Sequence, residues 1–166
     1  MDAMEGWSDF YTLIGATAGT LIGLIFVVVS LGADHAKAGD EHRTTVGVTP
    51  TLVHFAALLV SALAMLAPLS NIARAITLGI IGCAGLAYLF NLALLASKRI
   101  KAEERDTLLF GVLPMVAYAG FVVTGAAWAF AASFAPEIGG LASVLLLVAA
   151  LHNSWEMTLL IVSRPG

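Results

Sequence analysis

The sequence predicts an all-α integral membrane protein, a five-helix bundle whose N terminus lies outside and whose C terminus lies in the cytoplasm. Hydrophobic residues make up 60% of the 166 residues, whereas soluble domains contain roughly 45–50%. Only 11% of the residues are charged, against about 25% in a typical soluble domain. The mean hydropathy is +0.95, and the apolar residues fall into long runs of the length that crosses a bilayer, about 20 residues each.

Five such runs lie in a single domain covering residues 1–166, at about 8–31, 51–69, 72–96, 108–133 and 140–162. The first run is longer than the 7–15 residues of a signal-peptide core, and its leader is acidic, so we expect it to be retained. The second is expected to begin after Pro50, because an X-Pro pair favours extended backbone.

The turns between the later runs are marked by their composition. Pro68 to Asn71 predicts a tight turn, with Ser70 or Asn71 capping the third helix. Pro114 predicts a kink in the fourth helix, because proline removes a backbone donor. The segment 135–140 predicts the last turn, before a fifth helix that starts at about residue 140.

The distribution of positive charge predicts the direction of the helices. With five spans, one side of the membrane carries seven basic residues: Lys37, Arg43, Lys98, Arg99, Lys101, Arg105 and Arg164. The other side carries only Arg74, near the outer end of the third span, where its side chain can reach the interface. Because basic loops stay in the cytoplasm, we expect the N terminus outside. Trp7, Tyr11 and Trp128 fall near the outer boundary, where aromatic belts form.

Small residues form one face of the first predicted helix. Gly15, Gly19 and Gly23 recur every fourth residue, and Thr12 and Thr20 lie on the adjoining arc. Tandem GxxxG patterns let two helices approach closely, which is the main source of helix association in lipid. The partner can be another helix of the same chain, or the face can form a subunit contact or line a pore. A similar stripe runs along the third helix: Ala75, Gly79, Cys83, Ala87 and Asn91.

Five polar side chains are predicted to lie in the cytoplasmic half of the membrane: His54, Asn91, His152, Asn153 and Glu156. Polar groups inside a span are costly and often functional. His152 and Glu156 are four residues apart, so they share one helix face. The cluster has three interpretations: hydrogen-bonding contacts between helices, an ion or proton pathway or gate, and a metal or ligand site in which His54, His152 and Glu156 are the metal candidates.

Two stretches of sequence resemble a known group. Trp7 to Tyr11 with the run Gly15–Leu31 resembles the first helix of a family of small multi-span bacterial membrane proteins, and Thr49 to Phe55 resembles the start of their second helix. The similarity covers about a third of the chain. It implies a multi-pass protein of the bacterial inner (plasma) membrane, and it implies no activity.

We therefore expect a homo-oligomeric channel or small transporter for a cation or proton. The alternatives are an accessory or regulatory membrane protein that packs against a partner complex, and an intramembrane metal or haem protein. The leading hypothesis requires no cofactor, and its partners are the lipid bilayer, further copies of the chain and the cation or proton. The sequence contains no basic tract with interleaved aromatics of the kind that binds nucleic acid.

Overall fold

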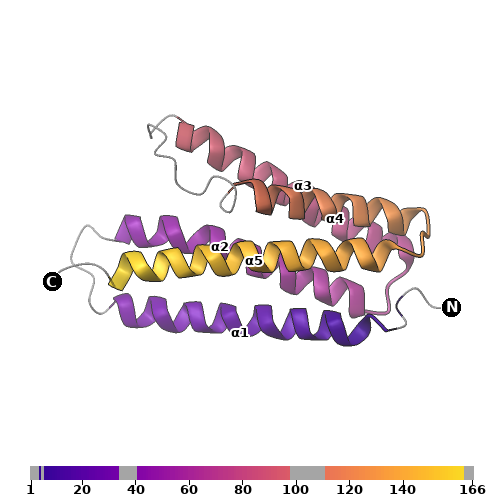
Figure 1. The fold of residues 1–166 in the computed structure, drawn as a ribbon, viewed down its shortest axis with the longest axis horizontal. Helices are drawn as coiled ribbons and strands as arrows, with labels where there is room; N and C mark the ends of the chain where they lie inside the picture. Colours follow the sequence, from indigo (N-terminus) through magenta and orange to yellow (C-terminus); the bar gives the residue numbers. More distant parts are fainter. Residues whose placement is uncertain (1–3, 5, 34–40, 98–110, 163–166) are drawn as a thin grey trace.

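The described residues form a bundle of five α-helices (Figure 1). This computed structural model describes residues 4, 6–33, 41–97 and 111–162, with side chains for residues 4, 6–30, 49–94 and 111–155. The helices are α1 (Ser8–Ala33), α2 (Glu41–Leu66), α3 (Asn71–Ser97), α4 (Leu113–Ala129) and α5 (Ala135–Val162). Within the described ranges no residue is in a β-strand, so the all-α class is confirmed.

Successive helices run in opposite directions, so α1 begins and α5 ends at opposite ends of the bundle (Figure 1). The main contacts join α3 to α4, α1 to α2, and α5 to both α4 and α2. In the apolar part of α5, 50% of the residues are buried, whereas in α1 only 11% are. Thus α5 is a central helix, and α1 lies at the periphery.

Four helices, α1, α2, α3 and α5, are long and apolar enough to cross a membrane. The fourth helix is shorter than its predicted span of 108–133, because α4 has 17 residues and ends at Ala129. Ala131 has a φ of 51°, a left-handed conformation that does not occur inside a right-handed helix. The start of the predicted span, residues 108–110, lies outside the described part of the chain.

Three prolines lie inside helices, and two of them contradict the predicted helix bounds. Pro50 lies inside α2, which begins at Glu41 instead of about residue 51, so the helix continues through the proline. Pro136 lies in the first turn of α5, which begins at Ala135, five residues before the predicted start. Pro114 also lies in the first turn of its helix. The predicted kink in the fourth helix stays a prediction, because residues 108–110 of the predicted span lie outside the described part of the chain. A first turn accepts proline because its N–H groups have no partner within the helix.

The start of α3 agrees with the sequence. The Ser70 hydroxyl accepts a hydrogen bond of 3.2 Å from the Ala73 N–H, which is the bond expected of a serine directly before a helix. Its capping role is therefore confirmed.

Glycines bring the α3 and α4 backbones together. A Cβ added to Gly82 would lie 2.7 Å from the Tyr118 carbonyl oxygen, and one added to Gly125 would lie 2.7 Å from the Ala75 carbonyl oxygen. The buried side of α3 contains four residues: Leu78, Gly82, Gly85 and Leu89. The stripe predicted from Ala75 to Asn91 contacts α4 only in its first half, because Cys83, Ala87 and Asn91 are exposed.

Candidate functional site: a buried polar layer between α2, α4 and α5

A histidine and a tyrosine form a hydrogen-bonded pair inside the bundle. The Nδ1 atom of His54 on α2 lies 2.8 Å from the hydroxyl oxygen of Tyr118 on α4. Both side chains are 1% exposed, and their ring centroids are 5.6 Å apart. When the imidazole carries its proton on Nε2, the tyrosine donates to Nδ1; in the other tautomer the histidine donates. The pair therefore joins two helices through one hydrogen bond, in which either residue can be the donor.

The position of Tyr118 depends on α3. A Cβ on Gly85 would overlap three atoms of the tyrosine ring, so the ring packs against bare α3 backbone. Tyr118 was not among the predicted site residues. The contact could have been predicted from Gly82 and Gly85, which are three residues apart in the third helix, because small residues at such spacing leave a flat surface that accepts an aromatic ring.

Two further polar side chains are buried without hydrogen-bond partners in the described part of the chain. Thr51 precedes His54 by one helical turn, so both lie on the same face of α2. The side chain of Thr51 is 2% exposed and that of Asn153 on α5 is 8% exposed. Neither the Thr51 Oγ1 nor the Asn153 Oδ1 has a partner, although most buried polar atoms in proteins do.

Contacts near the start of α1 fix the relative levels of α1, α2 and α5. The hydroxyl of Tyr11 lies against Gly139 of α5, and Gly15 packs against Ala62 of α2, with 3.2 Å between a Gly15 Cβ and the Ala62 Cβ. Because α1 and α5 run in the same direction and α2 runs in the opposite one, these two contacts provide a common reference for the three helices.

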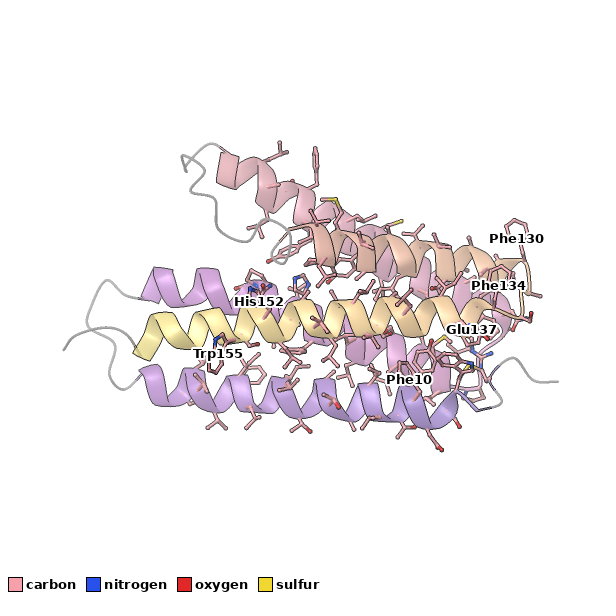
Figure 2. The ribbon with its side chains drawn as sticks, in the orientation of Figure 1. Phe10, Phe130, Phe134, Glu137, His152 and Trp155 are labelled. Atoms are coloured by element: carbon pink, nitrogen blue, oxygen red, sulfur yellow. The ribbon has the colours of Figure 1, made fainter. Side chains whose placement is uncertain are left out.

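Ala62, which contacts Gly15, lies about 6 Å along the bundle from Tyr11, because Gly15 follows Tyr11 by four residues. His54 precedes Ala62 by eight residues of α2, which adds about 12 Å, so His54 lies about 18 Å from the level of Tyr11 and Gly139. On α5 the same distance from Gly139 leads to about residue 151, which His152 and Asn153 follow directly. Figure 2 shows His152 on the α2 side of α5, whereas Trp155 projects on the α1 side. We call Thr51, His54, Tyr118, His152 and Asn153 the polar layer.

Two of the predicted site residues stand apart. The amide nitrogen of Asn91 donates to the Ala87 carbonyl of its own helix at 2.8 Å, and the side chain is exposed, where the end of α3 diverges from α2 (Figure 1). The structure therefore does not bring Asn91 into the polar layer. Glu156 belongs to α5, but its side chain lies outside the described residues, so its predicted role stays a prediction.

The small-residue face of α1 is used only in part within the chain. Gly15 packs against α2, whereas a Cβ on Gly19 or Gly23 would have no neighbour within 4 Å. Thr12 and Thr20 are exposed, and each hydroxyl donates at 2.8 Å to the carbonyl oxygen four residues earlier. Packing within the chain therefore accounts for the first glycine of the pattern and leaves the other two open.

Metal chemistry has limited support in the described residues, which bring together no group of three His, Cys, Asp or Glu side chains. Two of the three predicted ligands, His54 and His152, lie at one level, while the third is Glu156. The polar layer offers neutral oxygen and nitrogen atoms. Its described side chains include no carboxylate, lysine or arginine.

These features define the class: an all-α bundle, four of whose five helices have the length and apolarity of membrane spans, with a buried polar layer between α2, α4 and α5. Comparisons with protein-family models, with curated proteins and with solved structures give no match for this chain. The resemblance to small bacterial membrane proteins therefore stays an expectation.

Proposed function

We propose that all five helices cross the bacterial inner membrane, with the N terminus outside and the polar layer in the cytoplasmic half. The apolar surface of the bundle supports insertion, because large apolar side chains are more than half exposed on several helices: Leu13, Leu24, Ile80, Phe90 and Leu141. Water would not favour such a surface, but lipid does. With 17 residues, α4 extends about 25 Å, a modest mismatch that local thinning of the bilayer accommodates.

We further propose that the protein conducts a proton or a small cation through the polar layer. The observation that supports this function is the pair of buried oxygen atoms without partners in the described residues, on Thr51 and Asn153, at about the same level of the bundle as the hydrogen-bonded His54 and Tyr118. Polar groups that only hold helices together are expected to satisfy one another. Oxygen atoms without partners at the level of a histidine are instead suited to contact a transported ion that is positively charged or that donates hydrogen bonds.

The chemistry of the pair suits a proton. An imidazole accepts a proton on one ring nitrogen and releases it from the other. The Tyr118 hydroxyl both accepts and donates, so it can pass a proton to or from His54 Nδ1. This pathway lies within one copy of the chain. The exposed hydroxyls of Thr12 and Thr20, which were predicted to line a pore between copies, are already bonded to their own helix.

A flux assay tests the proposal. The purified protein is placed in liposomes that enclose a pH-sensitive dye, and a potassium diffusion potential drives proton entry; sodium and potassium fluxes are measured in parallel. We expect wild-type flux well above that of protein-free liposomes, and a loss of at least tenfold in His54→Gln and Tyr118→Phe.

The matched control is Ser61→Ala. Ser61 is also buried on α2, but its hydroxyl donates to the Leu58 carbonyl at 2.9 Å and lies outside the polar layer, so this variant should keep wild-type flux. Wild-type flux equal to that of empty liposomes for all three ions, or full activity in His54→Gln, would show that the polar layer does not conduct.

The open face of α1 supports a second candidate function, association with another copy or with a partner complex. A Cβ added to Gly19 or Gly23 would have no neighbour within 4 Å, and close backbone contact at such glycines stabilises helix pairs in lipid. Cys83 is the only cysteine, so Thr20→Cys in a Cys83→Ser background gives one thiol on this face. Oxidation in native membranes should yield a cross-linked dimer or a cross-link to a partner, and Ile14→Cys, which is buried, should yield neither. A monomer in both variants excludes this interface.

A further inference from the structure

A partly buried arginine lies at the end of the bundle opposite to the polar layer. Arg74 is in the first turn of α3, and it is the only lysine or arginine among the side chains that the structure describes. Its Nη2 donates to the Ala67 carbonyl at 3.1 Å, and its guanidinium carbon lies 4.9 Å from the ring centroid of Trp128. Its contacts therefore include an uncharged carbonyl and an aromatic face, and neither neutralises the charge.

Two N–H groups here have no acceptor in the described part of the chain. They are the Arg74 Nε and the Trp128 Nε1, both fully shielded. Trp128 itself is 3% exposed, so it is held inside the bundle and does not act as a surface anchor of an aromatic belt. A buried donor without an acceptor lowers the stability of the fold. Because one of the two donors belongs to the positively charged guanidinium, the favoured acceptor is a negatively charged group.

The surroundings are rigid on the protein side. Gly125, one turn before Trp128, lies against the α3 backbone, where an added Cβ would be 2.7 Å from the Ala75 carbonyl oxygen and 2.9 Å from the Gly79 nitrogen. The backbones of α3 and α4 are therefore close together one turn from Trp128, and the Arg74 side chain is held by its hydrogen bond to the Ala67 carbonyl and its contact with the Trp128 ring. Donors that are already held in place bind an anion at a lower entropic cost than mobile side chains do.

The outer surface at this end of the bundle is apolar. Ile72 and Ile76 are 56% and 57% exposed, and they lie on the side of α3 opposite to Arg74, because residues two apart in a helix do not share a face. Phe130, which follows Trp128 by two residues, is 87% exposed, and Figure 2 shows it pointing away from the bundle where α4 meets α5. A cationic donor group at an end of the bundle whose outer surface is apolar matches an amphiphile whose anionic head group is attached to acyl chains.

We propose that Arg74 and Trp128 form a binding site for a phosphate group, supplied by a phospholipid of the outer leaflet. The guanidinium donates charge-assisted hydrogen bonds to the phosphate oxygens. The indole N–H, which is shielded in this structure, donates to the same group once the side chains around it move, and the acyl chains lie along the exposed apolar surface at this end, which includes Phe130. This site lies at the opposite end of the bundle from the polar layer and does not depend on conduction.

Native mass spectrometry of the full chain in detergent tests the site with three probes: phosphatidylglycerol, a galactosyl diacylglycerol that lacks phosphate, and inorganic phosphate. We expect the wild type to retain phosphatidylglycerol through delipidation and to release the galactolipid. Retention should fall by about tenfold or more in Arg74→Gln and about fivefold in Trp128→Phe, because a hydrogen bond to a charged group contributes more than one neutral bond. Trp128→Phe keeps an aromatic ring in the core, so it tests the N–H group even if Arg74→Gln is poorly folded.

Glu137 lies at the same end of the bundle (Figure 2) and is exposed, so Glu137→Gln is the matched charge control, with retention unchanged or increased. The melting temperature is also measured in galactolipid with and without inorganic phosphate. An increase with phosphate in the wild type, absent in Arg74→Gln, would show that the site binds a free phosphate ion through the same groups. Equal retention of the two lipids with no response to phosphate, or retention in Arg74→Gln and Trp128→Phe equal to the wild type, would overturn the proposal.

Discussion

Replacing Gly85 with alanine tests how the bundle positions the tyrosine of the polar layer. The added Cβ would overlap the Tyr118 ring, and the ring has little room to move, because it is 1% exposed and hydrogen-bonded to His54. Either α4 moves away from α3, or the tyrosine leaves its position and the hydrogen bond to His54 breaks.

The expected magnitude follows from three contributions. Overpacking a well-packed core costs about 1–3 kcal/mol, and loss of an interhelical hydrogen bond in a membrane costs about 0.6–1.7 kcal/mol. The gain in helix propensity on replacing glycine with alanine offsets up to about 1 kcal/mol. We therefore expect Gly85→Ala to lower the free energy of unfolding by about 1–3 kcal/mol.

Gly79→Ala is the matched control on the same helix, because a Cβ at Gly79 has no neighbour within 4 Å. It should leave the stability unchanged or raise it by up to about 1 kcal/mol. Reversible unfolding in mixed micelles, followed by circular dichroism against the mole fraction of SDS, measures both variants. Equal stability of Gly85→Ala and Gly79→Ala would refute the proposed packing of Tyr118 against α3.

Three other substitutions have defined outcomes in the same unfolding assay. Tyr11→Phe removes a 2.7 Å hydrogen bond from the buried hydroxyl to the Pro136 carbonyl and should cost about 1 kcal/mol; an unchanged midpoint would mean that the bond does not join α1 to α5. Ser70→Ala removes the cap of α3 and should also cost about 1 kcal/mol, whereas Ser70→Asp should restore the stability. Gly125→Ala places a Cβ against α3 backbone that cannot rotate away, so it should cost about 3 kcal/mol, and a wild-type midpoint would contradict the close contact of α3 with α4.

The sequence predicted the helical class and the number of helices because both depend on local properties of the chain. Apolar runs of about 20 residues or more require backbone hydrogen bonds within each segment if they are to lie in lipid. The Ser70 cap is equally local, since the hydroxyl and the N–H that it accepts from are three residues apart. Helix ends at prolines were predicted less well, because Pro50, Pro114 and Pro136 are each compatible with more than one position in or near a helix.

The composition of the polar layer was decided by tertiary structure. The sequence identified His54, His152 and Asn153 as polar groups at similar depth, but depth does not determine which side of a helix faces the core. The rotation and tilt of α3 leave Asn91 exposed, while its glycines admit the Tyr118 ring, so a tyrosine from α4 is the observed partner of His54.

The sequence by itself therefore determined an all-α chain with long apolar helices, because hydrophobicity and chain length act residue by residue. Only the packing of five helices decided that Tyr118 and Thr51 accompany His54, that Arg74 stacks on Trp128, and that Gly19 and Gly23 stay open. Each of these depends on how one helix is rotated against another. That rotation follows from the fit of the glycines and aromatic rings across the interfaces, which a pattern along one helix does not specify.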